Sequence, residues 1–278
     1  MNVISEYIMA KFSVLMSVYY RELPEFLDIA LASVFDQTVL PDEVVLVKDG
    51  PLTPGLDAVI SRYAALQPEL HVITLPENVG LGSALNEGLK HCSYDLVARM
   101  DSDDICKPNR FEKQLAVYAQ SPHLAVVGSW VDEFIDDPAH LLSVRRTPCT
   151  PKEICHFARK RNPLNHPTVM FRKDAIQQVG GYQPFFLFED YYLWVRLLIN
   201  GFELYNIQES LLFFRSNPQM IARRGGLKYA LSEWRFLRVM HKVKWINTYT
   251  LLTNGFIRFT IRIMPNKIRT LIYKKLLR

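Results

Sequence analysis

The stretch at residues 42–50, DEVVLVKDG, joins a run of apolar and β-branched residues to the turn pair Asp49-Gly50. Such a run, closed by a turn, is typical of a strand. The next stretch, LDAVISRYAAL at 56–66, has the apolar spacing of a helix. Strand, turn and helix in this order form one βα unit of a parallel sheet.

The same unit recurs through the first 130 residues. The other predicted strands are FSVLMSVYY (12–20), LHVITL (70–75), YDLVARM (94–100) and LAVVGSWV (124–131). The other predicted helices are EFLDIALASVFDQ (25–37, after Pro24), LGSALNEGLKHC (81–92) and RFEKQLAVYAQ (110–120). This alternation predicts an α/β fold with a mostly parallel, Rossmann-like sheet and helices on both faces.

After about Phe134 the pattern changes. A proline-rich region holds a predicted strand, PTVMFRK at 167–173, and a predicted helix, YYLWVRLLIN at 191–200. From Gly226 onwards the predicted helices are basic and cover 227–245, 251–264 and 266–278.

Charge divides the chain of 278 residues into two parts. Residues 215–278 contain 15 Lys or Arg and one acid, a net +14, whereas residues 1–214 carry −9. A basic segment of this kind favours an anionic partner, which is a membrane, a nucleic acid or a phosphorylated ligand. The sequence has no secretory signal, no run of ~18 apolar residues and no CxxC pair, so we expect an intracellular protein.

Polar groups follow three of the predicted strands. Tyr19 and Asp49 end two of them, and VARMDSDDICKP (97–108) places Asp101, Asp103 and Asp104 after a third. Ligands of parallel α/β sheets bind at the carboxyl ends of strands. A nucleotide is the expected ligand, with its base at Tyr19 and Asp49 and its phosphates on a cation. Taken singly, Asp49 is explained by a turn and Tyr19 by strand packing.

Six segments in order resemble the motifs of family 2 glycosyltransferases. They are SVLMSVYYRE (13–22), EVVLVKDG (43–50), ENVGLGSALNEGL (77–89), ARMDSDD (98–104), NHPTVMFRK (165–173) and FEDYYLWVRL (188–197). The resemblance covers about residues 11–215 and implies the GT-A fold and inverting transfer from a nucleotide sugar. Within the family, the sequence is most similar to bacterial O-antigen and exopolysaccharide transferases. These include enzymes that add a β-1,3-linked hexose to lipid-diphosphate-linked GlcNAc or GalNAc.

The resemblance implies a nucleotide site. Ser17 and Tyr19 match positions that contact the base, and Asp49 matches the second acid of the family's Asp-Asp-Gly turn, which binds uracil N3–H. Lys48 stands where the family usually has the first acid. The uracil contact is expected to survive this departure.

The resemblance also implies a metal site. Asp101 and Asp103 match the family's DxD pair, with Asp101 near the ribose or a metal-bound water and Asp103 as a direct ligand. Hard oxygen ligands and a sugar diphosphate suit Mn²⁺ or Mg²⁺. Asp104 is expected to serve the local structure, as a cap or backbone partner.

One carboxylate is needed to take a proton from the acceptor hydroxyl in an inverting transfer. By its position before an apolar helix, Asp190 is explained as the N-cap. By the family's Glu-Asp motif it is the catalytic base, and Glu189 contacts the acceptor.

Five further residues are candidates for supporting roles. His166 lies where the family places a residue near the metal or acceptor, although a structural His is the commoner case. Trp130 and Asp132 are candidates for an acceptor platform, with core packing as the alternative for Trp130. Arg223 and Arg224, in QMIARRGG (219–226), either meet the diphosphate or belong to a solvated loop.

These expectations define a metal-dependent enzyme with a catalytic domain at 1–215 and a basic amphipathic helical tail at 216–278. It transfers galactose or glucose from a UDP-sugar to a polyprenyl-diphosphate-linked sugar in surface polysaccharide synthesis. The tail places it on the inner face of the bacterial cytoplasmic membrane, and we expect no nucleic-acid partner. The alternatives are a non-catalytic binding protein with a GT-A shell, or a transferase with another donor and a soluble acceptor.

Overall fold

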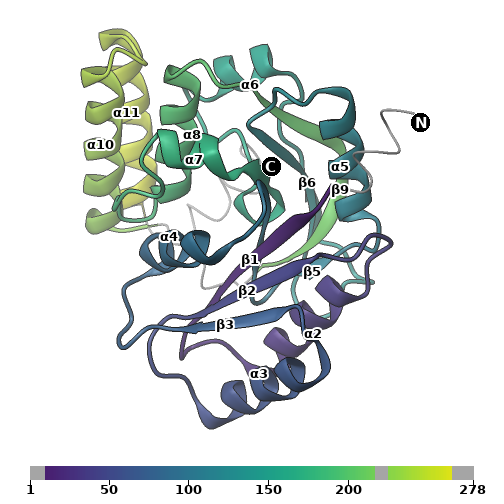
Figure 1. Ribbon diagram of the computed structural model, residues 1–278. Helices are drawn as coiled ribbons and strands as arrows, with labels where there is room; N and C mark the ends of the chain where they lie inside the picture. Colours follow the sequence, from purple (N-terminus) through teal and green to yellow (C-terminus); the bar gives the residue numbers. More distant parts are fainter. Residues whose placement is uncertain (1–9, 217–224, 265–278) are drawn as a thin grey trace.

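The computed structural model describes residues 10–216 and 225–264 and is built on one mixed sheet (Figure 1). The strands run in the order β3-β2-β1-β4-β8-β6-β9-β5, and β7 pairs with β6 beside this path. Their bounds are β1 Phe12–Val18, β2 Glu43–Lys48, β3 Leu70–Thr74, β4 Leu96–Asp101, β5 Ile105–Cys106, β6 Val126–Phe134, β7 Ser143–Arg145, β8 Met170–Arg172 and β9 Leu204–Arg215.

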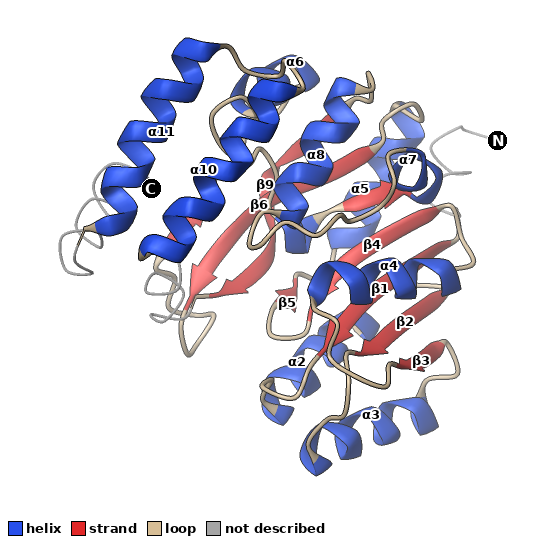
Figure 2. Cartoon of the chain, turned by 90° about the vertical axis from the view of Figure 1, so that its left-hand side faces the viewer, coloured by secondary structure: helices blue, strands red, loops and turns tan. Residues whose placement is uncertain are grey.

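Helices cover both faces of the sheet, as the alternating pattern predicts (Figure 2). One face packs against α2 (Pro24–Phe35), α3 (Pro54–Leu66) and α5 (Arg110–Gln120). The other packs against α4 (Leu81–His91), α6 (Pro151–Phe157), α7 (Lys173–Gln178) and α8 (Glu189–Ile199). A 3-10 turn, η1, spans His166–Thr168.

The parallel half of the sheet agrees with the sequence prediction, whereas the other half differs. β1 to β4 are parallel neighbours. β6, however, does not pair with β4, because the antiparallel β8 lies between them. The sequence analysis also missed β9, a strand of 12 residues parallel to β6. Polar residues interrupt the apolar pattern of β9, and its register with β6 shifts around Trp130.

Two antiparallel helices, α10 (Leu227–Lys242) and α11 (Thr248–Ile263), form a hairpin beside α8 (Figure 1). Phe236 and Met240 of α10 share a buried cluster with Tyr191 and Val195 of α8. These apolar contacts anchor the hairpin to the sheet domain. None of the helices in the described ranges has the length and hydropathy needed to span a membrane. The third predicted basic helix, at 266–278, lies outside the described residues.

One buried carboxylate joins the two helices of the hairpin. Glu233 is 2% exposed and forms salt bridges with Arg258 and Arg262 of α11. Burial by itself raises the pKa of Glu233, but the two guanidinium groups together hold this pKa below its usual value. The ionised carboxylate therefore stabilises the hairpin.

Replacing Glu233 by Gln is expected to lower the free energy of unfolding by about 3 kcal/mol, because the half-buried guanidinium groups of Arg258 and Arg262 lose their counter-charge. The pKa is lowered in the folded protein, so this stabilisation is present above the usual pKa of about 4.3 and is lost as the pH falls through the folded value. Urea denaturation at pH 7 and pH 4 measures both effects. Glu209→Gln, which breaks the exposed bridge to Lys113, is the control and is expected to cost at most ~1 kcal/mol.

Candidate functional site

The parallel strands bring the predicted polar residues to one edge of the sheet. Ser17 on β1 pairs in register with Asp101 on β4. Tyr19 follows β1 directly and is 37% exposed, and the Asp49 amide donates to the Val18 carbonyl, 2.8 Å away. These residues therefore lie together at the carboxyl ends of three strands.

The Asp49 carboxylate orders the turn before α4. It is 3% exposed and accepts hydrogen bonds from the Val79 amide (2.7 Å), the Gly80 amide (3.1 Å) and the Asn78 side chain (2.9 Å). A carboxylate has about four acceptor positions. The turn alone therefore explains why Asp is needed here, and one acceptor position is left for a ligand.

Lys48, the departure from the family pattern, has a local partner. Its ammonium lies 2.6 Å from an Asp57 carboxylate oxygen at the start of α3. The added positive charge is thereby neutralised beside the sheet edge.

Four carboxylates crowd the end of β4. One oxygen each from Asp101, Asp103 and Asp104 lies within 4.8 Å of the others. Glu22, which accepts from the Ser102 hydroxyl at 2.9 Å, is the fourth. Burial, Asp101 and Glu22 raise the pKa of Asp103 to about 7. The sequence analysis missed Glu22 because it lies 80 residues away along the chain.

Two arginines hold this acidic loop. Arg99 is buried and forms a salt bridge with Asp101, while its Nε and Nη1 have no hydrogen-bond partner among the described residues. Arg215, at the end of β9, donates from its amide to Asp104 Oδ1 (2.8 Å) and from Nε to the Asp103 carbonyl (2.9 Å). The guanidinium of Arg215 stacks on Phe26 and Phe134. The loop is thus fixed from the strand that the sequence analysis missed.

Asp104 is fully buried, and its bond to Arg215 agrees with the local role predicted for it. Burial, Asp103 and Asp101 raise its pKa. Its Oδ2 is buried and lacks a hydrogen-bond partner in the described part of the chain. An orphaned carboxylate oxygen beside two further carboxylates fits a hard divalent cation, which prefers oxygen ligands.

The first turn of α8 contributes two more carboxylates. The helix begins at Glu189 and its N-cap is Phe188, so Asp190 is not the cap, and that alternative is wrong. Asp190 Oδ2 instead accepts from Asn162 Nδ2 at 2.6 Å. Burial raises the pKa of Glu189, and Asp190 adds to this effect.

The half-buried His166 and the buried Tyr182 form a pair. His166 Nε2 lies 2.8 Å from the Tyr182 hydroxyl. Burial, followed by the charge of Arg99, lowers the pKa of His166, so the imidazole is neutral. Burial raises the pKa of Tyr182, and both Asp190 and Asp101 contribute in the same direction. The Tyr182 hydroxyl is therefore close enough to Asp101 and to Asp190 for both charges to act on it.

Two further candidates, Trp130 and Asp132, have local partners. Trp130 donates to the Thr147 carbonyl and stacks with Arg146. Asp132 is buried and lies 2.6 Å from the Lys107 ammonium. The charge of Asp132 is thereby balanced by a neighbouring cation. Arg223 and Arg224 lie outside the described residues.

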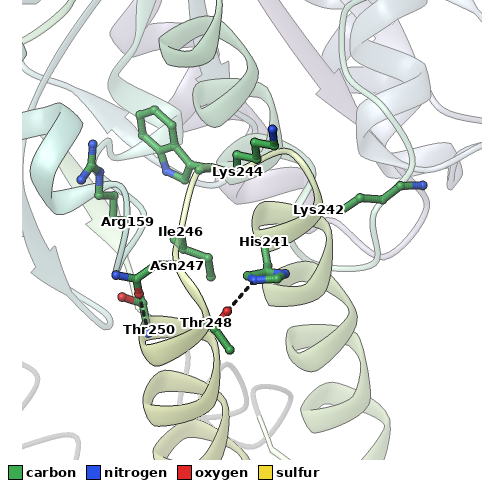
Figure 3. A pocket seen from close by; sticks show the side chains of 9 residues that line it. Arg159, His241, Lys242, Lys244, Ile246, Asn247, Thr248 and Thr250 are labelled. Carbon is green, nitrogen blue, oxygen red and sulfur yellow. Dashed lines mark hydrogen bonds between the residues drawn. The ribbon is translucent and has the colours of Figure 1, made fainter.

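A separate cavity of about 680 Å³ lies at the turn between α10 and α11 (Figure 3). It shares no residue with the acidic cluster. Its lining includes Arg159, Lys242 and Lys244 but no carboxylate. This cavity therefore lacks the carboxylate oxygens that the acidic cluster offers to a hard cation.

Comparison with known proteins identifies the class of protein to which this chain belongs. The sequence profile described as Glycosyl transferase family 2 matches residues 13–180, and this chain belongs to that family. It is 40% identical over 271 residues to an Escherichia coli protein named UDP-Gal:alpha-D-GlcNAc-diphosphoundecaprenol beta-1,3-galactosyltransferase. The alignment covers 96% of this chain and 97% of that one. The protein is a glycosyltransferase.

Solved structures agree on the fold. The Staphylococcus aureus TarS fragment 1–349 in complex with UDP-GlcNAc has a TM-score of 0.68 at 17% identity, over 96% of this chain and 76% of that chain. The mannosyltransferase PcManGT from Pyrobaculum calidifontis, in complex with GDP-Man and Mn²⁺, has a TM-score of 0.61 at 16% identity, over 97% and 81%. The expected GT-A fold is thereby confirmed.

Proposed function

We propose that this glycosyltransferase moves galactose or glucose from a UDP-sugar to a GlcNAc- or GalNAc-diphosphate-lipid, with inversion at the anomeric carbon. The observation that carries the proposal is the cluster of Asp101, Asp103 and Asp104, together with Tyr182, whose hydroxyl is affected by the charges of both Asp101 and Asp190. The name of the E. coli relative supports this donor and acceptor class.

On the donor side, the uracil is assigned to Asp49 and Tyr19. Asp49 keeps one acceptor position for N3–H, and the exposed ring of Tyr19 is available for stacking. Ser17 and Asp101, paired in register, face the ribose. The turn at 78–80 holds Asp49 in place before any ligand binds, which reduces the entropy lost on binding.

On the metal side, Asp103 is assigned as a ligand of Mn²⁺ or Mg²⁺, with Asp101 as its partner. Such an ion, when bound, stabilises the negative charge that develops on the leaving diphosphate. Arg99 and Arg215 hold the backbone and side chains of the loop, so the carboxylates keep their spacing without the ion.

Asp190 is assigned as the general base. The acceptor oxygen attacks the anomeric carbon, the bond from that carbon to UDP breaks, and the hydroxyl proton passes to Asp190 Oδ. Asn162 donates to the other side of this carboxylate and fixes its direction. Glu189 contacts the acceptor sugar, and burial raises the pKa of its carboxyl. His166 supports this region through Tyr182.

Residues 1–215 form the catalytic domain in this proposal. The segment 216–278 holds the enzyme on the inner face of the bacterial cytoplasmic membrane, where a polyprenyl-diphosphate acceptor resides. Its net charge of +13 supports this location, because anionic lipids attract juxtamembrane Lys and Arg. The reaction would serve the assembly of a surface polysaccharide.

A donor panel tests the proposed function. UDP-Gal, UDP-Glc, UDP-GlcNAc and UDP-GalNAc are each offered with synthetic GlcNAc- and GalNAc-diphosphate-lipids in the presence of Mn²⁺. We expect UDP release and a β-linked hexose from UDP-Gal or UDP-Glc, with the linkage determined by NMR. If only apolar contacts distinguish two donor sugars, their kcat/KM values are expected to differ by ~10–200-fold. If the pocket hydrogen-bonds a hydroxyl that only one of them presents, the ratio is expected to be ~10⁴-fold or more.

Two results would contradict the proposal. Tight UDP-sugar binding without UDP release in any acceptor combination would favour a non-catalytic binding protein. Release with free GlcNAc as efficient as with the diphosphate-lipid would favour a transferase with a soluble acceptor.

A further inference from the structure

The outward side of α11 is apolar. Tyr249, Leu252, Phe256 and Ile263 follow one another at helical spacing, and the first three are 76%, 57% and 74% exposed. Helices of globular proteins usually place charged residues on the solvent side. An exposed apolar stripe of this length marks an interaction surface.

The outward side of α10 is cationic. Lys228, Arg235, Arg238 and Lys242 are exposed at spacings of seven, three and four residues. Glu233 is the sole acid in the sequence 227–263, and it is buried. The hairpin therefore presents no exposed carboxylate to offset these four cations.

Both stripes face the same side of the hairpin. Trp234 of α10 faces Gly255 of α11, and Arg262 of α11 reaches back to Glu233. Successive residues of a helix are rotated by roughly 100° about its axis. On each helix, the exposed stripe therefore lies about 120° around the axis from the residues that contact the other helix. Because the helices are antiparallel, these rotations carry both stripes away from α8. We call the four apolar and four cationic residues the hairpin face.

The hairpin face continues to the catalytic helix. Phe186 and Leu187, just before Glu189, are 48% and 45% exposed. The Lys228 ammonium lies 4.6 Å from the centre of the Phe186 ring, and the Ser232 hydroxyl donates to the Phe186 carbonyl at 2.8 Å. Leu187 has a φ of 64°, a left-handed conformation that is costly for a branched side chain. The first turn of α10 thus holds an exposed apolar loop beside Asp190.

We propose that the hairpin face, together with Phe186 and Leu187, lies in the interface of a bilayer that contains anionic lipids. The apolar stripe enters the acyl boundary, and the cations of α10 meet lipid phosphates. This arrangement rests on the proposed function, because it brings a lipid-diphosphate sugar to Asp190 from the membrane side. The cationic cavity at the turn of the hairpin extends the same charge beyond Lys242 (Figure 3).

A bilayer explains this surface better than a second copy of the chain does. A two-fold contact would bring the same four cations of each copy close together, and neither hairpin offers an exposed carboxylate to pair with them. An anionic bilayer buries the apolar stripe in its acyl boundary and pairs its phosphates with the cationic stripe.

Vesicle sedimentation of the full chain tests the proposal. We compare vesicles of phosphatidylcholine with vesicles that also contain one quarter phosphatidylglycerol, and expect binding to the second kind only. Arg235→Gln with Arg238→Gln is expected to weaken this binding about 30-fold, since each cation near the surface contributes about a factor of five. Leu252→Gln with Phe256→Gln is expected to weaken it at least ~10-fold.

Leu66→Gln, at an equally exposed leucine of α3, is the matched control and should bind like the parent chain. Binding of both double variants at the parent level would overturn the proposal. If the parent chain is a dimer in sedimentation velocity, and the double variants lose the dimer while vesicle binding is unchanged, the hairpin face belongs to a contact with a second copy.

Transfer to a short-chain, water-soluble acceptor separates the membrane proposal from the proposed function. If this transfer fails in the parent chain while vesicle binding persists, the proposed function is wrong and the membrane surface stands.

Discussion

Asp190→Asn is expected to lower kcat at least ~10²-fold, the size of a general-base contribution. The amide cannot take the hydroxyl proton, yet its oxygen can still accept from Asn162, so the first turn of α8 should keep its structure. The KM for the UDP-sugar is expected to stay near the parent value, because Asp190 is assigned to proton transfer from the acceptor and not to donor binding. Steady-state kinetics with a diphosphate-lipid acceptor measures both constants.

Glu189→Gln is the matched comparison, one residue away on the same turn. Its main effect is expected on the KM for the acceptor, since Glu189 is assigned to acceptor binding and not to proton transfer. A larger loss of kcat in Glu189→Gln than in Asp190→Asn would reverse the two assignments. Near-parent turnover in Asp190→Asn with an intact fold would remove Asp190 from the chemistry.

Asp103→Asn is expected to lower kcat/KM by ~10²-fold or more, because a metal ion that stabilises the leaving diphosphate contributes several kcal/mol. EDTA should abolish transfer by the parent chain, and Mn²⁺ or Mg²⁺ should restore it. A Mn²⁺ titration followed by electron paramagnetic resonance gives a second readout, in which the variant binds the ion more weakly.

The metal-free Asp103→Asn variant is also expected to melt at a higher temperature than the parent. The reason is that Asp101 and Glu22 repel the Asp103 carboxylate, as its raised pKa indicates. Higher stability combined with lower activity would separate a lost ligand from a damaged fold. Asp36→Asn, at an exposed carboxylate after α2, is the control. Full activity of the EDTA-treated parent would contradict the metal assignment.

The first half of the fold was accessible from the sequence because its signals are local. Each parallel strand from β1 to β4 is a continuous apolar run with its own turn and helix. The second half depends on long-range pairing. β8 is three residues long and is held in the sheet by its pairing with β4 and β6. β9 has polar residues in its middle. The sequence predicts a strand at β8 but not its place between β4 and β6, and periodicity does not reveal β9.

The site shows the same division. The acids of the loop and Asp190 could be found from motifs, as could Asp49. Glu22 and Arg215 could not, because their partners come from elements distant in the sequence. The role of Asn162 likewise depends on a loop that packs against α8 in space. Motif spacing predicts which groups could act, whereas tertiary packing decides what orients them.

The order in which β6 and its partner strands occur in the sequence also affects how the chain folds during synthesis. β1 to β4 have all their mutual partners once residue 101 has left the ribosome. β6 pairs with β7, β8 and β9, all of which are synthesised after it. Since N-terminal segments fold first during translation, we expect β1 to β4 to fold early. β6 is expected to complete its pairing only after residue 215 has been synthesised. The acidic loop then acquires its final shape last, when Arg215 arrives.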